Sequence, residues 1–262
     1  MFSDYDQADG LRRIMAKSSA RILSVITANG QPAGIWLNQL AASMAGAGQR
    51  ALLIQAMPQA VTTHTLHAVA SKKSILSRAI VKHPHGYDLA ALTENSALSS
   101  ALSDDVKTAL DGIVNRLAYD YDTVMIEAQP DQHEQRLTLP VMAQHALVIQ
   151  MERSEEAIKS AYITIKRLCQ QHTQQALSIM VTDASHAQGQ QYFMRLNQVC
   201  EQFLGISLNF LGAVPGMSAV QNRSSIHHRN ESSPAAQMAL AFKTITGSLE
   251  KQRLASPALA AV

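Results

Sequence analysis

The segment SVITANGQPAGIWLNQLA, residues 24–41, joins a short apolar run to an amphipathic run through a loop that contains Gly30 and Gly34. The first run predicts a β-strand and the second an α-helix, because their apolar residues follow the periods of those two structures. A strand, a glycine-containing loop and a helix in this order form an arrangement in which backbone N–H groups at the helix N-terminus can hold phosphate.

The same alternation of apolar and amphipathic runs continues along the chain. Strands are predicted at residues 22–27, 51–56, 87–92, 123–128, 146–151, 177–181 and 210–214, and helices at 36–47, 61–71, 105–118, 155–171 and 190–204. Most of the strand runs are continuously apolar, which is typical of strands buried on both faces of a parallel sheet. The sequence therefore predicts one three-layer, doubly wound α/β domain with a mostly parallel sheet, spanning residues 21–254.

The composition excludes several classes of protein. Hydrophobic residues make up 47% of the 262 residues and charged residues 16%, a balance that favours a globular domain over disorder. A formal charge of +2, without a run of basic residues, gives no indication of direct nucleic-acid binding. The start of the chain is polar and acidic, no apolar stretch is long enough to span a membrane, and Cys169 and Cys200 have no metal-ligand spacing. These features predict a soluble cytoplasmic protein with free thiols.

By its position and its flanks, segment 24–41 resembles the deviant Walker A loop of the MinD/ParA ATPases, in which Lys-Gly-Gly-x-Gly-Lys-Thr precedes a helix that ends Asn-Leu-Ala. The resemblance implies a P-loop NTPase fold. It does not extend to the chemistry, because the chain has no lysine between Lys17 and Lys72. Pro32 lies inside the loop and has no N–H to donate, and neither Gly34 nor Ile35 offers a hydroxyl for Mg²⁺.

Two further positions of the ATPase site have changed. The Asp-rich motif expected after the second strand is replaced by Gln55 and Met57, and the expected Walker B aspartate is Glu127. The degenerate nucleotide site predicted from the resemblance comprises Asn29, Gly30, Pro32, Ala33, Gly34, Gln55 and Glu127. Each charged hydrogen bond to phosphate contributes about 1.5–3 kcal/mol, so losing several of them should weaken ATP·Mg²⁺ binding by orders of magnitude. No bound cofactor or metal and no intrinsic catalysis are expected.

The N-terminal segment carries the most specific resemblance. Asp6, Gln7, Ala8, Leu11 and Arg12 match the Asp-Gln-Ala-x-x-Leu-Arg motif of the flagellar-number regulators FlhG/FleN, a branch of the MinD/ParA group. Shorter matches to this branch lie at residues 121–126, 160–166, 203–208, 211–215 and 233–236. The resemblance implies that residues 1–20 form a partner-binding arm that stimulates an FlhF-type signal-recognition GTPase, and that the protein restrains a flagellar transcription activator.

The sequence thus predicts a non-catalytic regulator of flagellar number and placement that acts by binding proteins. Its partners would recruit it from the cytoplasm to the cell pole or the inner membrane. Two alternatives remain open at this stage. One is an active ATPase whose phosphate site uses Arg50 or Lys72, and the other is a MinD/ParA-like scaffold for another system, such as cellulose synthesis or plasmid partition.

Two other features allow competing interpretations. A last helix is predicted from Pro234 to about residue 249, and its stripe of Met238, Phe242, Ile245 and Leu249 would either pack on the sheet, which we favour, or bind a membrane. His64 and His67 would share a helical face but have no nearby Cys or carboxylate, so a metal site is not favoured. Residues 255–262 are predicted to be a flexible tail.

Overall fold

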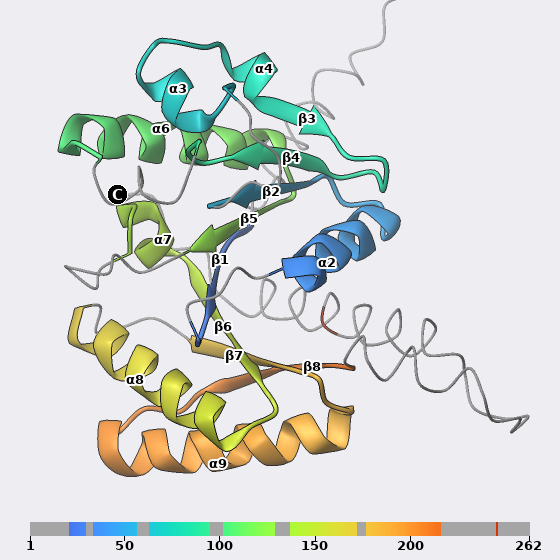
Figure 1. Ribbon diagram of the computed structural model, residues 1–262, viewed down its shortest axis with the longest axis vertical. Coiled ribbons are helices and arrows are strands. Elements are labelled where there is room, and N and C mark those ends of the chain that lie inside the picture. The colour runs from blue at the N-terminus through green and yellow to red at the C-terminus, as the bar shows by residue number, and fades with distance from the viewer. Residues whose placement is uncertain are drawn as a thin grey trace, which may run out of the picture.

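A computed structural model describes residues 21–29, 34–56, 63–94, 102–128, 137–171, 177–215 and 245 (Figure 1). Within these ranges the chain forms eight strands, β1 (Arg21–Thr27), β2 (Ala51–Gln55), β3 (Ile80–Lys82), β4 (Asp88–Ala91), β5 (Thr123–Ala128), β6 (Ala146–Glu152), β7 (Leu177–Thr182) and β8 (Asn209–Val214). The helices are α2 (Gly34–Gly46), α3 (Leu66–Ala70), α4 (Leu76–Ala79), α6 (Asp104–Asp120), α7 (Pro140–Gln144), α8 (Glu155–Gln171) and α9 (His186–Leu204).

The strands form one sheet in the order β3-β4-β2-β5-β1-β6-β7-β8. All neighbouring pairs are parallel except β3 and β4, which are antiparallel. From β1 the chain first builds the sheet towards β4, and after β5 it crosses β1 and builds towards β8. The predicted doubly wound, mostly parallel sheet is therefore confirmed. In such sheets ligands bind at the carboxyl ends of the strands where the winding direction reverses, and here that place is around β1.

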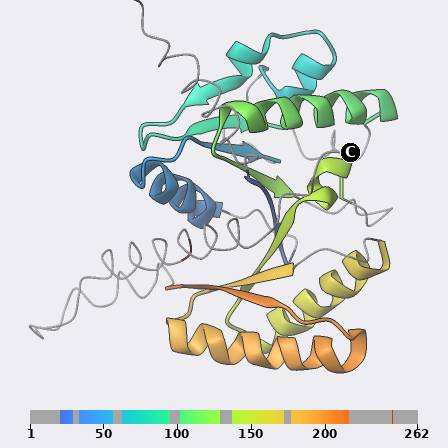
Figure 2. The same ribbon diagram turned by 180° about the vertical axis from the view of Figure 1, so that it is seen from behind.

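Helices cover both faces of the sheet (Figures 1 and 2). One face packs against α2, whose buried Leu37, Leu40 and Met44 meet Leu23 and Val25 of β1. The opposite face packs against α6, α7, α8 and α9, in a second core that includes other residues of the same strand. Successive strand residues point to opposite faces, so a strand covered on both sides must be apolar throughout. This requirement produces the continuous apolar runs.

Most predicted elements lie close to the observed ones, and three differences have local causes. The helix predicted at 61–71 is wrong at its start: among the described residues it begins at Leu66, because Thr65 has extended backbone angles and its side chain accepts the N–H of Ala68 as an N-cap. His64 therefore lies outside the helix and shares no helical face with His67. The short elements β3, α4 and α7 were not predicted.

The third difference concerns α9, which begins at His186 rather than at residue 190. Ser185 and Gln188 form a reciprocal capping box that satisfies backbone donors of the first turn. Gly205 ends the helix in the left-handed region, which glycine adopts without a steric penalty. Strong caps at both ends thus extend the helix to 19 residues.

The arm (1–20), the tail (255–262) and nearly all of the predicted last helix lie outside the described residues. Ile245 is described, and it is fully buried in the core on the α2 face. Within the described ranges, no helix combines the length and apolar character needed to cross a bilayer.

Candidate functional site

Five buried polar side chains lie near the carboxyl ends of five neighbouring strands. We call them the polar row: Gln55 of β2, Glu127 of β5, Thr27 of β1, Gln150 of β6 and Thr182 of β7. Each follows by two residues a member of the core on the α2 face, these members being Leu53, Met125, Val25, Val148 and Met180. Residues two apart on a strand point to the same face, so the polar row lies on the face that α2 covers.

Glu127 is the carboxylate of the polar row. It is 5% exposed, and its Oε2 accepts a hydrogen bond of 3.2 Å from the backbone N–H of Ala56. Ile54 pairs with Ile126 in the β2–β5 register, so Gln55 and Glu127 are the next residues along the two strands. The structure thus brings together two of the positions predicted from the sequence, although 71 positions separate Ala56 from Glu127.

The other half of the polar row is a network of uncharged groups. Gln150 Nε2 donates to Thr182 Oγ1 at 2.7 Å, and this hydroxyl donates in turn to the carbonyl of Met151 at 3.4 Å. Thr27 pairs in register with Gln150, and the N–H of Ala28 donates to the carbonyl of Gln150 at 2.8 Å. The side chains of Gln150 and Thr182 thus bond each other without a net charge, and none of the three side chains offers a cation to an incoming phosphate.

The loop after β1 meets the end of β6. Exposed Asn29 donates from Nδ2 to Glu152 Oε1 at 3.3 Å, and Gly34 is the first residue of α2. The structure therefore places Asn29, Gly34, Gln55 and Glu127 at one edge of the sheet. The predicted positions Gly30, Pro32 and Ala33 lie outside the described residues.

Arg50 does not lie at this edge. It precedes β2, and its guanidinium pairs at 3.5 Å with Asp122, which precedes β5, while its backbone N–H donates to the same carboxylate at 2.8 Å. Because β2 has five residues, Arg50 is about 16 Å from the carboxyl end of that strand. At this distance the Arg50 guanidinium does not take the place of the Walker A lysine.

Lys72 also lies away from the loop after β1. It follows α3, whose first turn is fixed to the end of β4 by a hydrogen bond from His67 N to the carbonyl of Leu92. In the sheet β4 is three strands from β1, which corresponds to about 14 Å.

One cation at the carboxyl edge was not predicted from the sequence. Arg153 directly follows β6, and its Nε donates to the carbonyl of Asp183, just after β7, at 3.0 Å. Asp183 has φ 58° and turns the chain there. The guanidinium of Arg153 is thus held over the β6–β7 side of the edge.

Three members of the polar row, Thr27, Gln150 and Thr182, were also missed. Their signal in the sequence is a polar residue near the end of an otherwise apolar strand, as in ALVIQM at residues 146–151. In the described part of the chain, no group of three or more His, Cys, Asp and Glu side chains is placed to hold a metal ion.

No protein-family model matches this chain, and no curated protein matches it. Solved structures do resemble it. A putative plasmid partition protein from Borrelia burgdorferi bound to AMPPNP has 14% identity and a TM-score of 0.60, with 89% of this chain and 99% of that chain covered. MinD of Aquifex aeolicus in its complex with MinC has 13% identity and a TM-score of 0.60, with 92% and 99% covered. A second Aquifex aeolicus MinD structure has 14% identity and a TM-score of 0.56, with 88% and 98% covered. The fold is therefore the MinD/ParA-type P-loop NTPase fold.

Proposed function

We propose that this protein is a non-catalytic regulator built on the MinD/ParA fold, which acts by binding proteins and does not use ATP turnover. The observation that carries the proposal is the polar row, whose five side chains are uncharged apart from the Glu127 carboxylate. In P-loop proteins this region holds Mg²⁺ and the phosphates, which need a lysine, a hydroxyl and consecutive backbone N–H groups.

The electrostatics of this edge support the proposal. Glu127 would lie near the phosphate charges of a bound nucleotide and, without Mg²⁺, would repel them. In an active P-loop ATPase a cation lies between the carboxylate and the phosphates. The carboxylate already accepts the N–H of Ala56. No lysine occurs between Lys17 and Lys72 to offset the repulsion between Glu127 and the phosphates. Arg50 is paired with Asp122 at the opposite edge of the sheet.

We propose further that the protein acts in the control of flagella. The Asp6-Gln7-Ala8 motif with Leu11 and Arg12 supports a role in flagellar number and placement, in which the N-terminal arm stimulates an FlhF-type GTPase. A flagellar transcription activator is the second proposed partner. These partners would bring the protein from the cytoplasm to the cell pole or inner membrane.

A second candidate function is an ATPase with an atypical phosphate site, and Arg153 is the observation that favours it. Its guanidinium lies at the carboxyl edge of the sheet, and arginine binds phosphate through paired N–H donors. To act there, the Arg153 guanidinium would have to leave the carbonyl of Asp183.

A scaffold role in plasmid partition is the third candidate, favoured by the similarity to the Borrelia burgdorferi protein.

We expect isothermal calorimetry to detect no saturable binding of ATP·Mg²⁺ up to about 1 mM nucleotide. Trp36, the one tryptophan of the chain, lies in the first turns of α2, and its fluorescence provides a second readout at the same place. Micromolar affinity would refute the non-catalytic assignment, as would ATP turnover abolished by Glu127→Ala. If Arg153→Ala in turn abolished such binding, the second candidate function would replace the first.

We expect the full-length protein to accelerate single-turnover GTP hydrolysis by the cognate FlhF-type GTPase, and Gln7→Ala to remove most of that acceleration. A glutamine supplied in trans can orient the attacking water, so its loss should cost at least about tenfold in rate. Lys17→Ala, in the same arm but outside the motif, is the matched control. Equal acceleration by wild type and Gln7→Ala would show that the motif has another role.

A further inference from the structure

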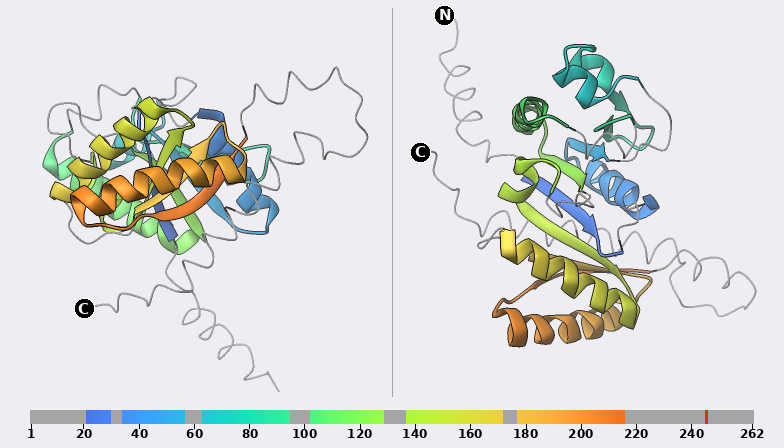
Figure 3. Two further views of the ribbon diagram at one scale, coloured as in Figure 1. Left: turned by 90° about the horizontal axis from the view of Figure 1, so that it is seen from below. Right: turned by 60° about the vertical axis from the view of Figure 1, so that its left-hand side comes forward.

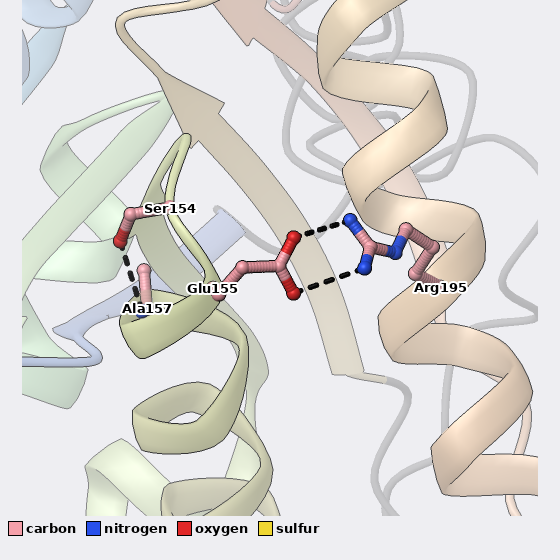
Figure 4. Close-up of polar contacts among 4 residues, drawn as sticks. All are labelled: Ser154, Glu155, Ala157 and Arg195. Atoms are coloured by element: carbon pink, nitrogen blue, oxygen red, sulfur yellow. Dashed lines mark hydrogen bonds and ion pairs between the residues drawn. The ribbon is translucent and has the colours of Figure 1, made fainter.

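The turn that joins α3 to α4, together with α4 and β3, carries a cluster of positive charge. Four exposed basic side chains lie within 11 residues, and we call them the basic cluster: Lys72, Lys73, Arg78 and Lys82. The chain has no Asp or Glu between Asp9 and Asp88, and in the part that the structure describes none of the four forms an ion pair. Arg195 on α9 is a contrasting case, because two of its guanidinium nitrogens bond the carboxylate of Glu155 on α8 (Figure 4). The basic cluster is thus open to an anionic partner.

Lys72 occupies a position where glycine is the usual residue. The end of α3 is a Schellman motif, in which the N–H of Lys72 donates to the carbonyl of Val69 at 3.0 Å and the N–H of Lys73 to the carbonyl of Ala68 at 2.8 Å. The motif holds Lys72 at φ 58°, in the left-handed region that glycine adopts without the steric cost of a side chain. Local stability favours glycine here, so the presence of lysine indicates a use for its charge.

Ile75 is also unfavourable for the turn itself. It is the N-cap residue of α4, where Ser, Thr, Asp or Asn would accept a backbone N–H, and its own side chain makes no capping hydrogen bond. It is 58% exposed to solvent. Residues that break local rules are expected at functional sites. Lys72 and Ile75 together give this turn a charged contact group and an apolar one.

The turn projects from the molecule in a fixed conformation. Among the described residues, the connection between α3 and α4 lies at one end of the molecule, next to the β3 edge of the sheet (Figures 1 and 3). The Schellman hydrogen bonds tie it to α3, and a contact of 3.2 Å between His64 Nδ1 and Ser74 Oγ ties it to the residues before α3. A fixed, projecting turn can contact a flat surface without needing a complementary groove.

We propose that the basic cluster and Ile75 form a contact surface for a lipid bilayer with anionic headgroups. The basic side chains lie against the headgroup phosphates, where each adds roughly fivefold to the affinity, and Ile75 enters the boundary of the acyl chains. This contact is direct and is separate from any recruitment by a partner protein.

Two other anionic partners fit the surface less well. A sugar–phosphate backbone offers no apolar counterpart to the exposed Ile75. An acidic peptide that added a strand to the sheet would have to pair with β3, and this edge strand has only three residues.

The first test is cosedimentation of the full-length protein, without nucleotide, with vesicles of phosphatidylglycerol and phosphatidylcholine in equal amounts. Binding is expected at about 50 mM salt and should be lost at about 500 mM, because salt screens exposed charges. Vesicles of phosphatidylcholine alone should not bind. The double variant Lys72→Gln with Lys73→Gln should weaken binding to the anionic vesicles by at least about tenfold.

The matched control is Lys159→Gln with Lys166→Gln, which removes the same charge from exposed sites on α8 and should leave binding within about twofold of wild type. A wild-type chain that does not bind the anionic vesicles at low salt would overturn the proposal. Binding that the Lys72 and Lys73 substitutions leave intact would also overturn it, as would an equal loss in the α8 control.

Lys72→Gly and Ile75→Thr distinguish a role in binding from a role in the fold. Glycine removes the steric cost at φ 58°, and threonine supplies a capping hydroxyl while keeping a β-branched side chain. Neither variant should lower the midpoint of urea unfolding, whereas each should weaken vesicle binding by about threefold or more. Lower midpoints with unchanged vesicle binding would show that the two residues serve the fold and would contradict the proposal. None of these measurements involves ATP or GTP, so this inference and the proposed function can fail separately.

Discussion

Replacing Gly189 by alanine is expected to destabilise the protein by about 1–3 kcal/mol, although alanine is the better helix former. Gly189 is the fourth residue of α9 and lies where the helix presses on the sheet. A Cβ atom at this position would be 2.4 Å from Cβ of Ala213 on β8 and 3.4 Å from Cβ of Val181 on β7. Neither neighbour is the movable end of a long side chain, so helix and sheet would have to separate.

The matched control is Gly112→Ala in the exposed middle of α6, where an added Cβ meets nothing within 4 Å. At this position the change in stability is set by the lower backbone entropy of alanine in the unfolded chain, and we expect Gly112→Ala to stabilise the protein by about 0.5–1 kcal/mol. Urea unfolding of the two variants should give midpoints on opposite sides of wild type. The double variant Gly189→Ala with Ala213→Gly should recover part of the loss, and the absence of any recovery would contradict the steric explanation.

Leu23→Ala should cost about 2–5 kcal/mol of unfolding free energy. Leu23 is fully buried at the centre of the sheet, paired in register with Met125 and Ala146, and packs in the core on the α2 face. Truncation removes apolar contacts and leaves a cavity that neighbouring strands cannot close. Trp36 packs against the same core, so its fluorescence reports the transition directly.

Leu23→Met is the control for this variant, because it keeps nearly the same volume and should cost less than about 1.5 kcal/mol. If both substitutions had equally small effects, the core between α2 and the sheet would be packed more loosely than described. If both were equally severe, the shape of the side chain and not its volume would control stability at this position.

The order of the elements was predictable because strands buried on both faces of the sheet must be continuously apolar, and such runs are visible in the sequence. The strand at 123–128 and the helix at 155–171 coincide with β5 and α8 at both ends. The first ends where polar residues replace the apolar run, and the second follows Ser154, whose hydroxyl accepts the N–H of Ala157. Local chemistry decides such boundaries, and local chemistry is visible in the sequence.

Short elements were missed because local sequence does not decide them. β3 has three residues, too few to show a period, and it forms because β4 offers it an antiparallel partner. The helix start at Leu66 depended on whether Thr65 would continue the helix or cap it, and both are compatible with its sequence neighbours.

The sequence alone determined that this chain builds an α/β sheet and that the loop after its first strand has no lysine, because both follow from which residues are present and how they are spaced. Only the tertiary structure decided which side chains face the carboxyl edge. β5 inserts between β1 and β2, and the parallel register then places Gln55 beside Glu127 and Thr27 beside Gln150. Thr27 lies two residues beyond Val25, the partner of Glu127, and Thr182 lies two residues beyond Met180, the partner of Gln150, so all five side chains share the α2 face near the strand ends. The strand direction put Arg50 at the opposite end of β2 from Gln55. The sheet order put β4, which holds the helix before Lys72, three strands from β1. Strand order and register depend on packing between residues far apart in the chain, and no local pattern records them.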